Sequence, residues 1–171
     1  MGRRGLVSAL VLLLGGCGFS PLYAPVAGRA PSSDLAKIFV AVIPDRPGQL
    51  LREALQVRLE GAGAPAAKRY TLEVNYGISS EGIGIQPDSS STFTRIKATA
   101  NWRLLSATPG AAPLASGVAT AEDGYSVIVD QYFYSDLQNG AVDRRFAKTL
   151  ADQIVLRLAA YFRDRAKVAA R

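Results

Sequence analysis

The sequence of 171 residues contains no histidine and only one cysteine. Without histidine the chain cannot build a Ser-His-Asp or Cys-His catalytic site, nor a metal site that depends on imidazole. A single cysteine excludes an internal disulfide bond and a cysteine cluster for zinc or iron–sulfur. The groups left for catalysis are carboxylates, lysine and serine, and no G-x-S-x-G motif is present. We therefore expect a binding protein rather than an enzyme, with no catalytic residues, no metal and no cofactor.

Acidic residues are fewer than basic ones, because Asp and Glu total 14 whereas Lys and Arg total 20, which gives a net charge of +6. An excess of positive charge favours anionic partners such as lipid headgroups, nucleic acid or acidic proteins, and does not choose among them. Hydrophobic residues make up 49% of the chain, which is enough for the core of a single domain of this length.

The only cysteine follows a short apolar segment near the N-terminus. Arg3 and Arg4 precede the mostly apolar run Leu6–Leu14, and two glycines separate this run from Cys17. A bilayer-spanning helix needs about 20 apolar residues, so the run is too short for an ordinary anchor. A basic start, a short apolar core and small residues before a cleavage point are typical of a secretory signal. The order Leu-Gly-Gly-Cys resembles the lipobox of bacterial lipoproteins, in which the thiol accepts diacylglycerol.

These features predict a signal peptide over residues 1–16 and lipidation of Cys17. The alternative is a buried structural cysteine beside a chance apolar stretch. Residues 17–34 are expected to form the lipidated N-terminus and a flexible tether, because Phe19–Asp34 is rich in Pro, Ala, Gly and Ser. The folded domain is expected to occupy residues 35–171 as one unit.

Hydrophobic periodicity divides the expected domain into four strands and two helices. Strands are expected at 37–44, 68–79, 92–105 and 114–129, the first of them buried on both faces and the others on one. A first helix is expected to be capped by Asp45 and to end at Gly61, and a second runs from Ser135 or Asp136 to Arg165. The segment Glu81–Ser91 is expected to be a turn or loop.

This order of elements predicts an α+β fold. We expect a two-layer sandwich in which one mostly antiparallel four-stranded sheet carries two helices on one face. Short turns join the three later strands, which should therefore be antiparallel, whereas the first strand connects through a helix and is able to pair in parallel. The apolar stripe of the second helix comprises Val142, Phe146, Leu150, Ile154, Leu158 and Phe162.

Several stretches together resemble one family. They are the lipobox, the opening "CGFSPLY", the stretches "FTRIKATANWRL" and "YFYSD", and the tail "RRFAKTLADQIVLRLAAYF". With the element order, they are similar to LptE, the lipopolysaccharide-assembly lipoprotein family, in its alphaproteobacterial branch. The resemblance implies a non-enzymatic lipoprotein, anchored in the outer membrane by lipid, whose domain lies on the periplasmic side or in the lumen of the β-barrel LptD. It also implies that the lipoprotein and LptD together insert lipopolysaccharide (LPS) into the outer leaflet.

Three basic residues lie on one face of the strand expected at 92–105. Arg95, Lys97 and Arg103 are separated by two and six residues, or about 7 and 20 Å along an extended strand. This row could meet the phosphates of a lipid A headgroup, since arginine binds phosphate oxygens in pairs. The alternative is that these residues confer solubility or protect the edge of the sheet.

Three aromatic residues, Tyr132, Phe133 and Tyr134, precede the second expected helix. They could contact the wall of a partner barrel, because aromatic residues anchor interfaces. Packing of their loop onto the core is the alternative.

A second functional class remains compatible with the residues. The chain could be an accessory lipoprotein of a periplasmic lipid-transport complex of the ABC type, which also combines a lipobox with a small α/β domain. The two functions differ in their partner, an LptD-like outer-membrane barrel in one case and an inner-membrane transporter in the other. We expect no nucleic-acid partner in either case.

Overall fold

The computed structural model describes residues 31–61, 66–85, 91–108, 110, 112–126 and 132–170. Cys17 and the lipobox lie outside the described residues. The elements are α2 (Pro31–Leu35), β1 (Ile38–Val40), α3 (Asp45–Glu60), β2 (Tyr70–Ile85), β3 (Ser91–Ser106), β4 (Ala115–Ser126) and α4 (Tyr132–Ala169).

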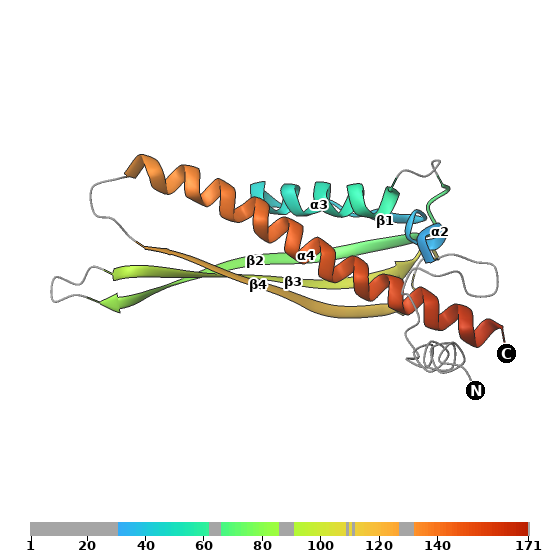
Figure 1. The fold of residues 1–171 in the computed structure, drawn as a ribbon. Helices are drawn as coiled ribbons and strands as arrows, with labels where there is room; N and C mark the ends of the chain where they lie inside the picture. The colour runs from blue at the N-terminus through green and yellow to red at the C-terminus, as the bar shows by residue number, and fades with distance from the viewer. Residues whose placement is uncertain are drawn as a thin grey trace, which may run out of the picture.

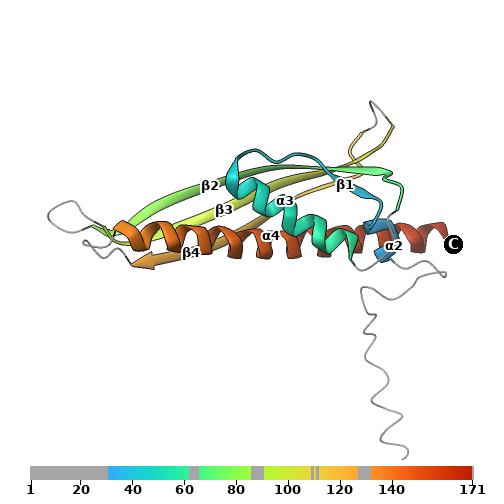
Figure 2. The same ribbon diagram turned by 90° about the horizontal axis from the view of Figure 1, so that it is seen from above.

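The four strands form one sheet in the order β1-β2-β3-β4. β1 pairs in parallel with β2, whereas β2–β3 and β3–β4 are antiparallel. The two long helices α3 and α4 lie against the same side of this sheet (Figures 1 and 2). The α+β architecture expected from the sequence is therefore confirmed, with the short helix α2 as an addition. α2 overlaps the end of the segment expected to be a tether.

The core lies between the sheet and the helices. Residues that the alternating pattern of the strands and the apolar stripe of the helix predicted to be buried form much of it. On β3, alternate side chains from Ile96 to Leu104 are buried, and their neighbours are turned to the other face of the sheet. On α4 every member of the predicted stripe is buried, from Val142 to Phe162. α3 adds three buried leucines one turn apart, which are Leu51, Leu55 and Leu59.

The first strand differs from the prediction. β1 contains only three residues, and Phe39 at its centre is 45% exposed, so the expectation of a strand buried on both faces is wrong. The physical reason is its position. β1 lies at an edge of the sheet, and only the face with Ile38 and Val40 joins the core, whereas Phe39 between them points to the other face. An apolar run alone does not distinguish an edge strand from a central one.

The helix α3 begins at Asp45 as expected, but its first turn is built differently. Pro44 occupies the N-cap position without a side-chain hydrogen bond, and Asp45 itself has φ of +64°. Gly48 is required in this turn, because a Cβ atom there would lie 2.7 Å from Cγ2 of Ile43. Asp45 therefore does not act as the predicted cap.

Two predicted boundaries were also wrong. Much of the expected loop Glu81–Ser91 is strand, since β2 continues to Ile85 and β3 starts at Ser91, with Ile83 opposite Phe93. α4 begins at Tyr132, before the predicted caps, and ends at Ala169. In the hairpin, glycine and polar residues indicated a loop, and strand pairing overrode them. In α4, Ser135 and Asp136 indicated a cap, and the helix continues through them.

Candidate functional site: the open face of the sheet

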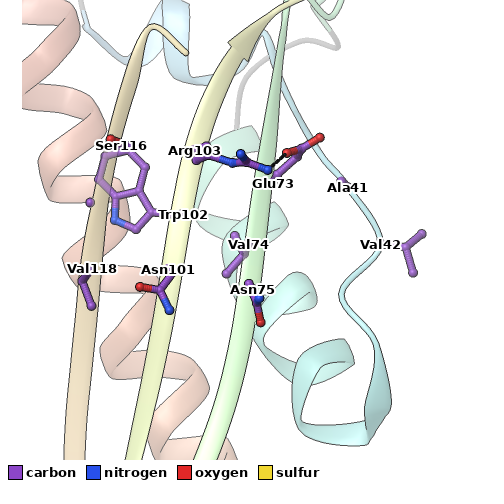
Figure 3. A pocket seen from close by; sticks show the side chains of 11 residues that line it. Ala41, Val42, Glu73, Val74, Asn75, Asn101, Trp102, Arg103, Ser116 and Val118 are labelled. Atoms are coloured by element: carbon purple, nitrogen blue, oxygen red, sulfur yellow. Dashed lines mark hydrogen bonds and ion pairs between the residues drawn. The ribbon is translucent and has the colours of Figure 1, made fainter. Parts of the chain in front are cut away.

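The sheet face opposite the helices carries a shallow cavity of about 670 Å³ (Figure 3). Side chains from β2, β3 and β4 form its floor, and the segment after β1 forms one side at Ala41 and Val42. The residues of the strands that point to this face are Glu73, Asn75, Asn101, Arg103, Ser116 and Val118. Because the strand register places them side by side, they form one continuous surface.

The lining of this cavity combines polar side chains with exposed apolar ones, among them Val42 and Val118. Asn75 and Asn101 are direct cross-strand neighbours, and both are exposed. Their amides offer hydrogen-bond donors and acceptors to a polar ligand or partner. At one rim Arg103 donates from Nη2 to Oε2 of Glu73 at 2.9 Å (Figure 3). The arrangement can bind polar groups, and it brings together no pair of nucleophile and base.

The predicted basic row lies on this open face, and Arg95, Lys97 and Arg103 are all exposed. Only Arg103 lines the cavity.

Each member of the basic row stands opposite a carboxylate of the next strand. Arg103 pairs with Glu73, Nζ of Lys97 lies 3.4 Å from Oε1 of Glu122 on β4, and Arg95 is in register with Glu81. Two of the three basic residues therefore pair with a carboxylate, which the sequence did not indicate. An incoming phosphate would have to compete with these carboxylates.

The aromatic residues Tyr132, Phe133 and Tyr134 lie in the first turn of α4 and not in a loop before it. The change follows from the earlier start of the helix. Their side chains lie outside the described part of the structure, so their contact with a partner stays a prediction.

The outer edge of β4 is covered by side chains of α4. Gln153 accepts from the Thr120 N–H at 3.3 Å and donates to the Thr120 carbonyl at 2.9 Å, while Arg157 donates to the carbonyl of Val118. These bonds satisfy backbone groups that an edge strand would otherwise present to another chain. Sequence reasoning missed them, because nothing local links residues more than thirty positions apart.

Further along the same edge, Asp123 binds both the backbone and α4. Its Oδ1 accepts from the N–H of Gly124 at 2.8 Å, and its Oδ2 accepts from Nη2 of Arg145 at 2.6 Å. The hydrogen bond from Arg145 holds the pKa of Asp123 below its usual value. Arg145 on α4 thus also helps to close the edge of β4.

The opposite edge of the sheet is different. β1 pairs with β2 only as far as Leu72, whose carbonyl accepts from the N–H of Ala41 at 3.0 Å. Beyond Leu72, no strand in the described part of the chain pairs with β2 on that side. Most of this long strand, residues 73–85, therefore presents its backbone at a sheet edge, a kind of surface to which other extended chains can add.

Neither a membrane-crossing helix nor a metal centre emerges from the described residues. None of the helices in those ranges is both long and apolar enough to cross a bilayer. Within the same ranges no three Cys, Asp or Glu side chains gather in a way that could hold a metal ion.

Comparison with known families gives one match. A family model described as LptE, Lipopolysaccharide-assembly, matches residues 35–158. This span contains α3, the whole sheet and most of α4. The comparison with curated proteins found no match.

Solved structures share the fold. A candidate lipoprotein from Caulobacter crescentus CB15 is 25% identical, with a TM-score of 0.59 over 79% of this chain and 96% of that chain. A minor lipoprotein from Acinetobacter baumannii is 17% identical, with a TM-score of 0.55 over 73% and 92%. Rare lipoprotein B from Shewanella oneidensis is 12% identical, with a TM-score of 0.56 over 75% and 96%. The last two likenesses concern the fold alone.

Proposed function

Because the chain belongs to the LptE family of lipopolysaccharide assembly, we propose that it is an outer-membrane lipoprotein that assembles with an LptD-like β-barrel and plugs it. In this role the protein takes part in inserting LPS into the outer leaflet and catalyses no reaction. Lipid on Cys17 anchors it, and its domain lies on the periplasmic side or in the barrel lumen.

One observation carries the proposal. The family match covers residues 35–158, so it includes both layers of the sandwich and not one motif. A lipobox alone would not suffice, since it is shared by lipoproteins of many functions. The assembly role therefore rests on the folded domain, and the anchor rests on the signal sequence.

The open face of the sheet supports the plug role. A barrel lumen is polar and filled with water, so a domain inside it needs a polar, charge-balanced surface. The face with Asn75, Asn101 and the Glu73–Arg103 pair has this character. Large apolar patches would instead be expected if the face packed against another hydrophobic core.

We further propose that the row Arg95, Lys97 and Arg103 contacts the phosphates of LPS. The row is exposed and lies on the open face. Arg95 is the member best placed for this, because no described carboxylate forms an ion pair with it. Binding at the other two members would exchange one anion for another, which lowers the net gain.

Co-purification tests the plug role. The full chain with a C-terminal tag is extracted gently from outer membranes and its partners are identified by mass spectrometry. We expect a large β-barrel protein in the eluate, and a tagged Cys17→Ser chain to lose its membrane attachment. Absence of any barrel protein would refute the proposal, and crosslinking to an inner-membrane transport complex would favour the accessory-lipoprotein function.

LPS titration tests the basic row. In the full chain, Arg95→Glu with Lys97→Glu should weaken LPS binding about tenfold or more, since each lost charged hydrogen bond costs on the order of 1.5–3 kcal/mol. The matched control is Arg46→Glu with Arg144→Glu, which makes the same charge change at two exposed positions outside the sheet. Unchanged affinity in the first variant would remove the row from the function and leave the plug role standing.

A further inference from the structure

A second cavity, of about 280 Å³, lies where the C-terminal end of α4 meets α2 and the start of β2. Its walls include Asp34 in α2 and Lys37 after it, Arg69 and Tyr70 where β2 begins, and Phe162 and Arg165 on α4. Figures 1 and 2 both place these three elements at one end of the molecule. The cavity is separate from the open face of the sheet, which lies on the other side of the strands.

The charge in this cavity is positive after its internal ion pair is counted. Nζ of Lys37 lies 2.8 Å from Oδ1 of Asp34, so these two charges offset each other. Arg69 and Arg165 remain, and neither forms an ion pair with another described residue. Arg69 and Arg165 therefore line one concave site, and neither has a carboxylate partner among the described residues.

The backbone and the floor of the cavity are held in place. The N–H of Arg69 donates to the carbonyl of Lys37 at 2.8 Å, and the carbonyl of Arg69 accepts from the N–H of Ala107 at 3.0 Å. The rings of Tyr70 and Phe162 pack with their centroids 5.2 Å apart. The site is thus preformed, with an apolar base below its charged groups.

A phosphate group is the ligand whose chemistry fits best. Guanidinium groups bind phosphate oxygens in pairs, and a concave positive site concentrates anions. The last carbonyls of α4 oppose an anion with about half a negative charge. The two positive charges of Arg69 and Arg165 outweigh this partial negative charge at the end of α4.

The position of the cavity indicates where the phosphate comes from. The described chain begins at Pro31 in α2, directly beside the cavity, and Cys17 lies 14 positions earlier in the sequence. A segment of that length spans at most about 50 Å. A lipid on Cys17 would therefore keep this end of the domain within reach of the headgroups of its own leaflet.

We propose that Arg69 and Arg165 bind the phosphate of a phospholipid headgroup in the leaflet that holds the anchor. This contact sets the end with α2 against the bilayer and directs the opposite end, with the β2–β3 hairpin, away from it (Figure 1). The inference rests on the lipid anchor of the proposed function. The ligand is a resident phospholipid and not the lipid that the family assembles.

Arginine-selective modification tests this site directly. The full lipidated chain is placed in vesicles of phosphatidylcholine alone or with phosphatidylglycerol, treated with phenylglyoxal and digested for mass spectrometry. We expect phosphatidylglycerol to slow modification of Arg69 and Arg165 at least about threefold, because bound phosphate covers the guanidinium groups. Arg46 and Arg144 are exposed internal controls whose rates should not change.

Two further samples identify the source of the phosphate. Inorganic phosphate in the buffer and phosphatidylcholine vesicles containing LPS replace phosphatidylglycerol. Equal protection by inorganic phosphate, or protection by LPS alone, would overturn the assignment to a phospholipid. Equal slowing at all four arginines would also overturn it, since it would reflect the general surface potential.

A variant tests whether the two arginines form one site. Arg69→Gln should abolish the protection of Arg165, whereas Arg46→Gln should leave it intact. Persistent protection of Arg165 in Arg69→Gln would refute the shared site. The intact mass of each preparation shows whether Cys17 carries lipid, and co-purification of the barrel with Arg69→Gln shows whether assembly is intact. These two measurements test the lipid anchor and the assembly with the barrel separately from phosphate binding in the cavity.

Discussion

The two faces of the sheet follow the same alternating pattern and are used in opposite ways. On the face under the helices, Leu72, Ala98, Ala100 and Leu104 are fully buried. On the open face most of the neighbouring residues are polar or charged, and two of the basic ones pair with a carboxylate across strands, as Arg103 does with Glu73. One face holds the fold together, and the other is free to meet a partner.

This difference predicts which substitutions should change stability and which should change binding. Burial of apolar groups contributes several kcal/mol at one position, whereas an exposed ion pair contributes little. Changes on the covered face should therefore alter the stability of the protein, and changes on the open face should alter binding alone. The following predictions test that separation.

The largest effect is expected in the centre of α4. Leu150→Ala removes a side chain that is fully buried, and should lower the free energy of unfolding by about 2–5 kcal/mol. Leu156→Ala makes the same chemical change on the same helix at a position that is 53% exposed, and should cost less than about 0.5 kcal/mol. Urea denaturation of the full chain measures both. Similar losses in the two variants would contradict the assignment of the buried stripe.

A smaller effect is expected where a strand leaves room for the only tryptophan. Gly117 stands opposite Trp102, and a Cβ atom there would lie 2.9 Å from Cζ2 of the indole. Gly117→Ala should therefore cost about 1–3 kcal/mol through overpacking. Gly77→Ala is the control, because its Cβ atom would meet nothing within 4 Å. Equal stability of the two variants would show that the indole moves freely.

Substitution of Tyr76 should raise the stability of the protein by up to about 1 kcal/mol, unlike the two preceding substitutions, which lower it. Its hydroxyl is buried without a hydrogen-bond partner among the described residues, so Tyr76→Phe should leave stability unchanged or raise it by up to about 1 kcal/mol. Thermal unfolding at neutral pH measures the change. A loss of stability would show that a water or another group satisfies the hydroxyl.

The same residue predicts a dependence on alkaline pH. Burial, with a contribution from the carboxylate of Asp143, raises the pKa of Tyr76 to about 12. An unfolded chain releases this proton near pH 10, while the folded chain keeps it. Stability should therefore fall as pH rises from 10 to 12, and the fall should be smaller in Tyr76→Phe. Parallel curves for the two proteins would contradict the buried environment.

The smallest effect is expected on the open face. A double-mutant cycle with Glu73→Gln and Arg103→Gln should give a coupling energy of about 0.2–1 kcal/mol, because both side chains are exposed to solvent. Stability measured at low and high salt should converge, since salt screens the pair. A coupling well above that range would mean that the open face also stabilises the fold.

Much of the fold could be predicted because the relevant signals are local. Alternation identified the buried face of β2 at Leu72 and Val74, and the stripe on α4 identified the face that meets the sheet. Arg95 and its neighbours were assigned to the open face for the same reason. The predictions failed where a local signal has two meanings, as with Gly82, which was assigned to a loop and pairs with Thr94 in a long hairpin.

The sequence by itself determined the alternation of each strand, the stripe of each helix and the positions of the basic residues. Spacing along the chain is enough for this, because side chains repeat every two residues on a strand and every 3.6 residues on a helix. Tertiary structure alone decided which charges meet. Glu73 and Arg103 are 30 residues apart, and the register of the β2–β3 hairpin joins them. Likewise, Arg69 and Arg165 share a cavity only because α4 packs back across the sheet to the start of β2. Contacts between distant segments depend on how the layers assemble, and no local pattern specifies that.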